Sequence, residues 1–147
     1  MSGKLPVSVL VVVHTPALEV LLLERAGRPG YWQSVTGSLD RLDEPLEDAA
    51  LREVREETGL QAPRERLRRW NAANVFEIYP EWRHRFRPGT THNAEHVFSL
   101  EVAAPAVVAL APEEHDAFTW LPWREAAAKC FSWSNRAAIL RLPEHAA

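Results

Sequence analysis

The chain has little cysteine, no long hydrophobic run and no strong excess of one charge. Its single cysteine, Cys130, has no partner for an internal disulfide and no companions for a zinc site, so we expect a buried structural thiol. The apolar run Val7 to Val13 is far shorter than the roughly 20 residues that cross a membrane, and its β-branched residues favour a strand over a signal peptide. These features predict a protein of a reducing compartment, the cytoplasm.

The charge balance argues against one broad class of function. The chain carries 17 lysines and arginines against 20 aspartates and glutamates, a formal net charge of -3. A general nucleic-acid-binding protein is usually basic. The arginines of residues 64–69 and 83–87 could form local basic patches, and a solvated surface is the simpler interpretation of the first cluster. We therefore expect neither a nucleic-acid partner nor a membrane.

Length and composition predict one globular domain over residues 1–147, since 46% of the residues are hydrophobic and no repeat or linker interrupts them. Helices are expected over residues 45–58 and Trp133–Leu142. The strands are too continuously apolar for a one-sided sheet, which predicts an α/β fold with a mixed central sheet and helices on both faces. The expected strands are Val7–Val13, Glu19–Glu24, Trp32–Val35, Leu67–Tyr79, Glu95–Val102 and Phe118–Leu121.

Proline marks the expected loops near residues 63, 80, 88 and 105. The segment Arg87–Asn93 is the best candidate for a mobile lid over a substrate.

The helix over residues 45–58 has clear start and stop signals. Pro45 fits a first helical position, and Gly59 fits the left-handed residue that terminates a helix. Gly37 lies upstream, in what we expect to be a glycine loop beside this helix.

Three carboxylates on one face of this helix indicate a metal site. At about 100° per residue, Glu53, Glu56 and Glu57 fall in one narrow sector at the rim of the core. Such like-charged pairs cost roughly 0.2 to 0.5 kcal/mol each, which a bound cation would remove. Oxygen ligands favour hard ions, so Mg2+ is the first choice and Mn2+ the second. The helix alone equally fits a solvated face laced by Asp48–Arg52 and Arg52–Glu56 pairs.

A longer pattern favours the metal site. The segment resembles the Nudix box, which has a glycine, five variable residues, a glutamate, seven variable residues and then R-E-U-x-E-E-x-G-U, with U a bulky aliphatic residue. From Glu44 to Leu60 the match is complete. Six residues separate Gly37 from Glu44, so either Asp43 keeps the glycine spacing or Glu44 keeps the helix spacing. We align Glu44, because loops absorb insertions more readily than helices.

The resemblance implies a Nudix α/β/α sandwich that cleaves phosphoanhydrides with a divalent metal. It implies that Glu53 and Glu57 bind the metal most directly and that Glu56 is a further ligand, through oxygen or water. Arg52 would orient these carboxylates, and Gly37 would let the backbone bend close by. The metal would neutralise phosphate charge and activate water.

A further carboxylate is expected from a distant loop. The segment from Pro112 to Trp120 resembles the stretch that supplies it, with Glu114 at the matching place as a ligand or as the base that activates water. Glu113 or His115 could be the functional neighbour instead. The alternative is an exposed acidic turn.

Residues 32–38, 76–79, 83–89 and 132–136 resemble one branch of the superfamily, the enzymes that cleave dihydroneopterin triphosphate in folate synthesis. Lys4 and Arg25 would supply positive charge for a triphosphate tail, although either could be a surface cation. An aromatic ring such as that of Trp133 could stack on the pterin. The residues that this similarity assigns to phosphate or pterin are Lys4, Arg25, Thr36, Gly37, Phe76, Glu77, Ile78, Tyr79 and Ser132.

The expected function is therefore Mg2+-dependent hydrolysis of dihydroneopterin triphosphate to dihydroneopterin monophosphate and pyrophosphate. One alternative is a nucleoside triphosphate diphosphohydrolase of the nucleotide pool. Another is a Nudix-fold sensor that binds a phosphorylated metabolite without turnover.

Overall fold

The computed structural model describes residues 3–146, and within them the strands form one mixed sheet. The sheet order is β3-β2-β1-β6-β5, while β4 also pairs with β1 and β7 with β2. Strands β1 and β6 run parallel, and the other pairs are antiparallel. The strands are β1 (Val7–His14), β2 (Glu19–Arg25), β3 (Trp32–Gln33), β4 (Val35–Ser38), β5 (Leu67–Glu77), β6 (His92–Glu101) and β7 (His115–Pro122).

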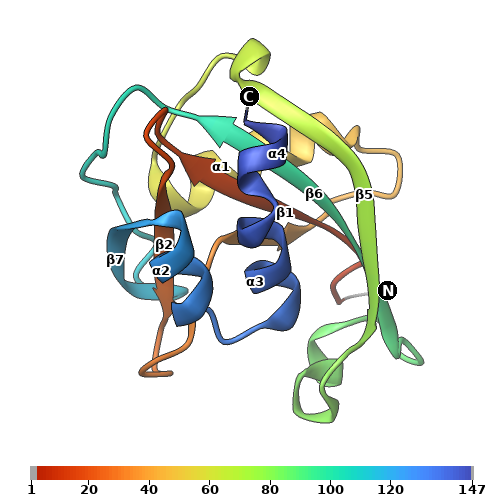
Figure 1. The fold of residues 1–147 in the computed structure, drawn as a ribbon. Coiled ribbons are helices and arrows are strands. Elements are labelled where there is room, and N and C mark those ends of the chain that lie inside the picture. Colours follow the sequence, from red (N-terminus) through yellow and green to blue (C-terminus); the bar gives the residue numbers. More distant parts are fainter. Residues whose placement is uncertain (1–2, 147) are drawn as a thin grey trace.

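Helices cover both faces of the sheet, as predicted (Figure 1). On one face, α1 (Leu46–Thr58) packs against β1 and β4. On the other lie α2 (Trp123–Lys129), α3 (Trp133–Leu140) and α4 (Leu142–His145). Two short 3-10 helices, η1 (Arg64–Arg66) and η2 (Pro80–Arg85), flank β5.

The central strand β1 explains why this sequence builds two layers of core. Val9 and Val11 pack with the apolar face of α1, whereas Leu10 and Val12 pack with α2, α3 and α4. Successive side chains of a strand point to opposite faces, so a strand buried on both faces is apolar throughout.

Helix α1 begins one residue later than predicted. Pro45 is extended, with φ -59° and ψ 138°, and it precedes the helix instead of forming its first residue. The end of the helix matches the prediction, because Gly59 has a left-handed φ of 73° and its N–H bonds to the carbonyl of Arg55.

The prediction that Gly37 lies in a loop was wrong. Gly37 belongs to β4 and lies opposite Val9 of β1. The third predicted strand is in fact two short strands, because β3 pairs with β2 and β4 with β1. The loop that accommodates the additional residue follows β4, at residues 39–45.

Several other boundaries differ from the predictions because pairing with a neighbouring strand decides where each strand ends. The β5–β6 ladder runs to the pair Glu77–His92, so β5 stops before Ile78, and the predicted lid segment is shortened to residues 87–91. Strand β7 starts at His115 because it pairs along the whole of β2. Helix α3 ends two residues early, at Leu140, and α2 was not predicted. Closure of a lid stays a prediction.

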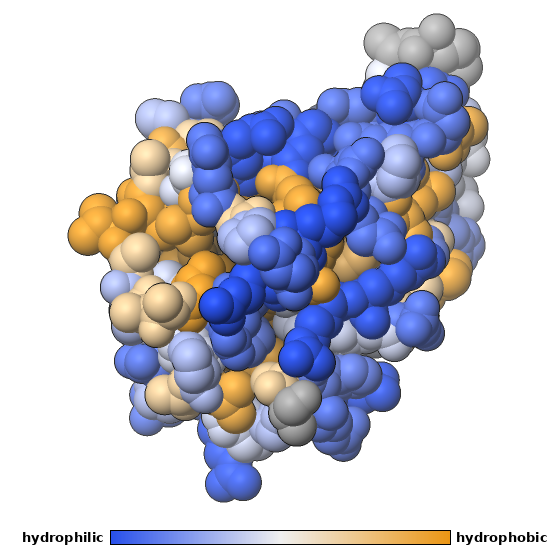
Figure 2. Space-filling model, turned by 90° about the horizontal axis from the view of Figure 1, so that it is seen from above, coloured by the Kyte–Doolittle hydropathy of each residue, from blue (hydrophilic) through white to orange (hydrophobic). Residues whose placement is uncertain are grey.

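The surface drawn in Figure 2 is mainly hydrophilic, with hydrophobic areas between the charged side chains. No helix within residues 3–146 is long and apolar enough to cross a membrane. Cys130 is a buried free thiol, as predicted, and burial raises its pKa to about 12.

Candidate active site

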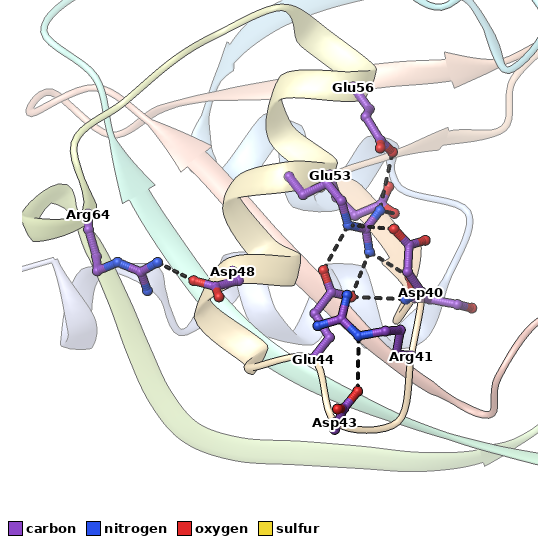
Figure 3. Close-up of polar contacts among 10 residues, drawn as sticks. Asp40, Arg41, Asp43, Glu44, Asp48, Glu53, Glu56 and Arg64 are labelled. Atoms are coloured by element: carbon purple, nitrogen blue, oxygen red, sulfur yellow. Dashed lines mark hydrogen bonds and ion pairs between the residues drawn. The ribbon is translucent and has the colours of Figure 1, made fainter.

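Arg52 organises the acidic side chains of α1 and of the loop before it (Figure 3). Its Nε and Nη2 donate to the two carboxylate oxygens of Glu44 at 2.9 and 3.1 Å. Its Nη1 donates to Glu53 Oε1 at 2.8 Å and to Glu56 Oε2 at 3.2 Å. One planar guanidinium therefore donates hydrogen bonds to three carboxylates, which its fork of donors allows, and it also pairs with a fourth, that of Asp40, at 3.2 Å.

Glu44 holds Arg52 in place. Its Oε1 also accepts from the backbone N–H of Asp40 at 2.9 Å, so both oxygens of this buried carboxylate are engaged. The hydrogen bond from Arg52 holds the pKa of Glu44 below its usual value. Asp43 is exposed and pairs with Arg41 instead. This geometry supports the alignment of Glu44, and not Asp43, with the box glutamate.

Of the two ion pairs expected for a solvated helix face, only one is formed. Arg52 does pair with Glu56, but Asp48 pairs with Arg64 of η1 (Figure 3).

Gly37 is a cradle for the carboxylate of Glu53. A Cβ placed on Gly37 would overlap the carboxylate carbon and both oxygens of Glu53. Glu53 is only 9% exposed, and this burial raises its pKa to about 7 even though the charge of Arg52 opposes the rise. The absent side chain of Gly37 is therefore what allows an acidic group to lie between helix and sheet.

A second acidic cluster forms where α1 meets the start of β7. The candidate ligand atoms of Glu57, Glu114 and His115 all lie within 4.8 Å of one another. Burial raises the pKa of Glu57 well above its usual value, and the charges of Glu53 and Glu114 add to the rise. Its Oε2 has no hydrogen-bond partner among residues 3–146. Because a buried acceptor without a partner is costly, this oxygen fits a cation ligand.

His115 is held by a chain of hydrogen bonds. Arg25 Nη1 donates to Gln33 Oε1 at 3.4 Å, which leaves the amide nitrogen of Gln33 to donate to His115 Nε2 at 3.3 Å. Burial lowers the pKa of His115, so the imidazole is neutral at pH 7. Since Gln33 engages the Nε2 lone pair, the carboxylates of Glu57 and Glu114 are the better ligands. Together they form a hard-oxygen donor set suited to Mg2+ or Mn2+.

One cavity of about 460 Å³ extends from this cluster across the edge of the sheet. Glu53, Glu56 and Arg52 are not among its lining residues, and Glu53 sits behind Gly37. The predicted site residues that line the cavity are Lys4, Arg25, Thr36, Gly37, Glu57, Phe76, Glu77, Ile78, Tyr79, Glu114 and Ser132.

Cationic side chains gather at the acidic end of the cavity. Partial burial lowers the pKa values of Lys4 and Arg25, and the nearby charge of Arg85 lowers both further. Crowded cations of this kind create a positive potential that an anionic ligand would relieve.

Aromatic rings line the other end. Phe76 and Trp133 meet edge to face with centroids 6.4 Å apart, and Trp82 lies 5.2 Å from Tyr79. Arg25 lies over the Trp82 ring at 4.9 Å, which links the aromatic end to the cationic end. Flat rings of this kind can stack on a flat heterocycle.

Sequence reasoning missed Gln33 and Trp82 as site residues. Gln33 lies on β3 opposite Leu23 of the buried strand β2, and it is itself buried. A position of this kind is usually occupied by an apolar residue. Trp82 lies close to several arginines in the sequence, which was the only signal available.

The sheet is mixed and covered on both faces, a partly buried arginine orders the acidic helix, and a cationic cavity lies beside that helix. These features are those of a phosphoanhydride hydrolase with a candidate metal site. Residues 4–142 match the NUDIX domain, and the chain belongs to this family. The predicted Nudix α/β/α sandwich is thereby confirmed.

Curated relatives and solved structures agree with this assignment. The chain is 42% identical over 139 residues to the dihydroneopterin triphosphate diphosphatase of Escherichia coli, covering 92% of this chain and 91% of that one. It is 36% identical over 135 residues to the Haemophilus influenzae enzyme of the same name, covering 90% and 84%. The structure of the E. coli dihydroneopterin triphosphate pyrophosphohydrolase superposes with a TM-score of 0.86, at 40% identity and over 96% and 97% of the chains.

Proposed function

We propose that this protein is a divalent-metal-dependent diphosphatase that converts dihydroneopterin triphosphate to dihydroneopterin monophosphate and pyrophosphate in folate biosynthesis. The observation that carries the proposal is one continuous cavity that joins an acidic cluster and cationic side chains to an aromatic wall. Relatives that carry this activity in their names match 92% and 90% of the chain. A free small molecule as substrate and a cytoplasmic location belong to the same proposal.

In this proposal Glu57 and Glu114 hold the metal, and Glu53 and Glu56 contribute through oxygen or water. The unpartnered oxygen of Glu57 and the mutual repulsion of the carboxylates support this role. Mg2+ is the first choice and Mn2+ the second. Such an ion, when bound, would neutralise phosphate charge and lower the pKa of a water molecule bound to it.

The chain's own side chains bind the triphosphate and handle the proton. Lys4 and Arg25 bind the tail, aided by Thr36, Gly37 and Ser132. A water oxygen bonds to a phosphorus of the α–β bridge, the bridging P–O bond breaks, and pyrophosphate leaves.

Glu114 takes the proton of the attacking water, because it is exposed in the turn before β7 and lines the cavity. Glu53 is buried behind Gly37 and does not line the cavity, so it would support the metal site and not act as this base. Arg52 is a positioning residue for Glu53 and Glu56.

The pterin ring would occupy the aromatic end of the cavity. Phe76 and Tyr79 lie beside Trp133 and Trp82, and Glu77 and Ile78 complete the same wall.

A panel of triphosphates tests this function. Purified protein is given dihydroneopterin triphosphate, dATP, GTP and oxidised dGTP, with Mg2+ or with excess EDTA, and released pyrophosphate is measured. We expect the highest kcat/KM for the pterin and no release in EDTA. Much higher specificity for a nucleotide would identify a nucleotide-pool hydrolase, and tight binding with no pyrophosphate released in Mg2+ would identify a sensor.

A further inference from the structure

Glu95 is a buried acid that the reaction above does not use. It lies on β6 between Ser8 of β1 and Asn74 of β5, and it is only 4% exposed. It shares a face of the strand with Val97, which packs in the core beneath α2, α3 and α4. Glu95 lines the same cavity as Glu57, but Glu57 comes from α1, whereas Glu95 comes from β6 and faces α3.

Two acceptor atoms at this place have no partner. Neither Glu95 Oε1 nor Asn93 Oδ1 accepts a hydrogen bond from any group of residues 3–146. Asn93 is 5% exposed, and its Nδ2 donates to Ser8 Oγ at 2.7 Å, which turns its amide oxygen away from Ser8. Buried acceptors are almost always satisfied in folded proteins, so an unmet pair in a cavity indicates a ligand with donors.

The surroundings favour neutral N–H donors over a cation. Burial raises the pKa of Glu95 to about 7, and only hydrogen bonds from the neutral side chains of Ser134 and Asn74 oppose the rise. Donors from a bound ligand would stabilise the ionised carboxylate without an ion pair.

Flat rings flank these acceptors. Phe76 lies opposite Asn93 in the β5–β6 ladder, and its ring meets that of Trp133 at the start of α3. Either ring offers a flat surface on which a planar heterocycle would stack beside these acceptors.

We propose that Glu95, with Asn93 beside it, is the specificity determinant that accepts hydrogen bonds from an amino group and the adjacent ring N–H of the substrate's heterocycle. The inference rests on the proposed function and deepens it. A 2-amino-4-oxopyrimidine ring carries this donor pair and is present in pterins and in guanine. Adenine and cytosine place a ring acceptor beside their amino group, so they would face Glu95 with a repulsive contact.

The variant Glu95→Gln tests the role, because it keeps the shape and replaces one acceptor by a donor. We expect kcat/KM for dihydroneopterin triphosphate to fall about 10- to 100-fold, mainly through KM. Turnover of dATP, which lacks the donor pair, should not fall, because the substitution removes the repulsive contact between its ring acceptor and the carboxylate. The matched control is Glu101→Gln on the same strand, a partly exposed residue that pairs with Arg66 and lies outside the cavity.

Unchanged pterin kinetics in Glu95→Gln would overturn the inference, as would an equal loss for both substrates at wild-type thermal stability. If the variant does not fold, the wild type still provides a test with GTP and inosine triphosphate, which differ by the 2-amino group. We expect GTP to be the better substrate or competitive inhibitor by about tenfold, and equal values would refute the role of Glu95. This comparison needs no pterin turnover, so its failure is distinct from failure of the proposed function.

Discussion

Adding a single methyl group at Gly37 should disable the site while leaving the fold intact. In Gly37→Ala the new Cβ would occupy the space of the Glu53 carboxylate. The backbone of Gly37 lies outside the left-handed region and within β4, so alanine itself brings no strain there. The whole effect therefore comes from moving Glu53.

The size of the effect follows from what Glu53 loses. Its 2.8 Å hydrogen bond from Arg52 would break, and a charged hydrogen bond contributes about 1.5 to 3 kcal/mol. Partial release of Glu53 from burial offsets some of this, so we expect the free energy of unfolding to fall by about 1 kcal/mol. A displacement of about 1 Å in a catalytic group can reduce the rate about 100-fold. We expect that loss in kcat/KM.

Two assays separate these effects: pyrophosphate release gives kcat/KM, and urea unfolding gives stability. Gly30→Ala is the matched control, because no heavy atom lies within 4 Å of its new Cβ but its φ of 85° is left-handed. Backbone strain should destabilise this control by about 1 kcal/mol and leave activity intact. Activity of Gly37→Ala within twofold of the wild type would refute the idea that Gly37 makes room for the Glu53 carboxylate.

Two substitutions in the site and one labelling experiment on Cys130 test the burial and charge of these side chains. In Glu57→Gln, pyrophosphate release should be lost. Because burial raises the pKa of Glu57, the stability of the wild type in EDTA should decrease as pH rises above about 4.5, the pKa of this group in the unfolded chain. The variant should therefore show a flatter dependence of Tm on pH and a higher Tm at pH 8. A lower Tm at pH 8 would contradict this reasoning. Arg52→Lys keeps the positive charge but loses the two parallel donors that bind Glu44. The free energy of unfolding, measured in urea, should fall by about 2 to 3 kcal/mol. An unchanged urea midpoint would count against a stabilising Arg52–Glu44 pair. Cys130 should resist a thiol reagent at pH 8 in the native protein and react fully in urea, because burial raises its pKa to about 12; rapid native labelling would show an accessible thiol.

The sequence predicted the features that local chemistry decides. Gly59 ends α1 because the left-handed conformation suits glycine, and the apolar run of β1 indicated a strand buried on both faces. The spacing of Glu53, Glu56 and Glu57 placed acidic side chains at the rim of the core. These signals need only a few neighbouring residues.

Features decided by distant pairing could not be predicted in the same way. Gly37 belongs to a strand because β4 pairs with β1, and β7 is long because it pairs with all of β2. The role of Glu95 depends on the meeting of β1, β5 and α3. Its one local signal is an acidic residue at a position of β6 that shares a face with the apolar Val97.

The most direct test of the account is pyrophosphate release from dihydroneopterin triphosphate by the purified protein, titrated with Mg2+ after treatment with EDTA. We predict no release in EDTA and recovery of full activity with added Mg2+ or Mn2+, at a kcat/KM above that of every nucleoside triphosphate in the panel. Undiminished release in EDTA would contradict the carboxylate metal site, and a preferred nucleotide would contradict the pterin substrate.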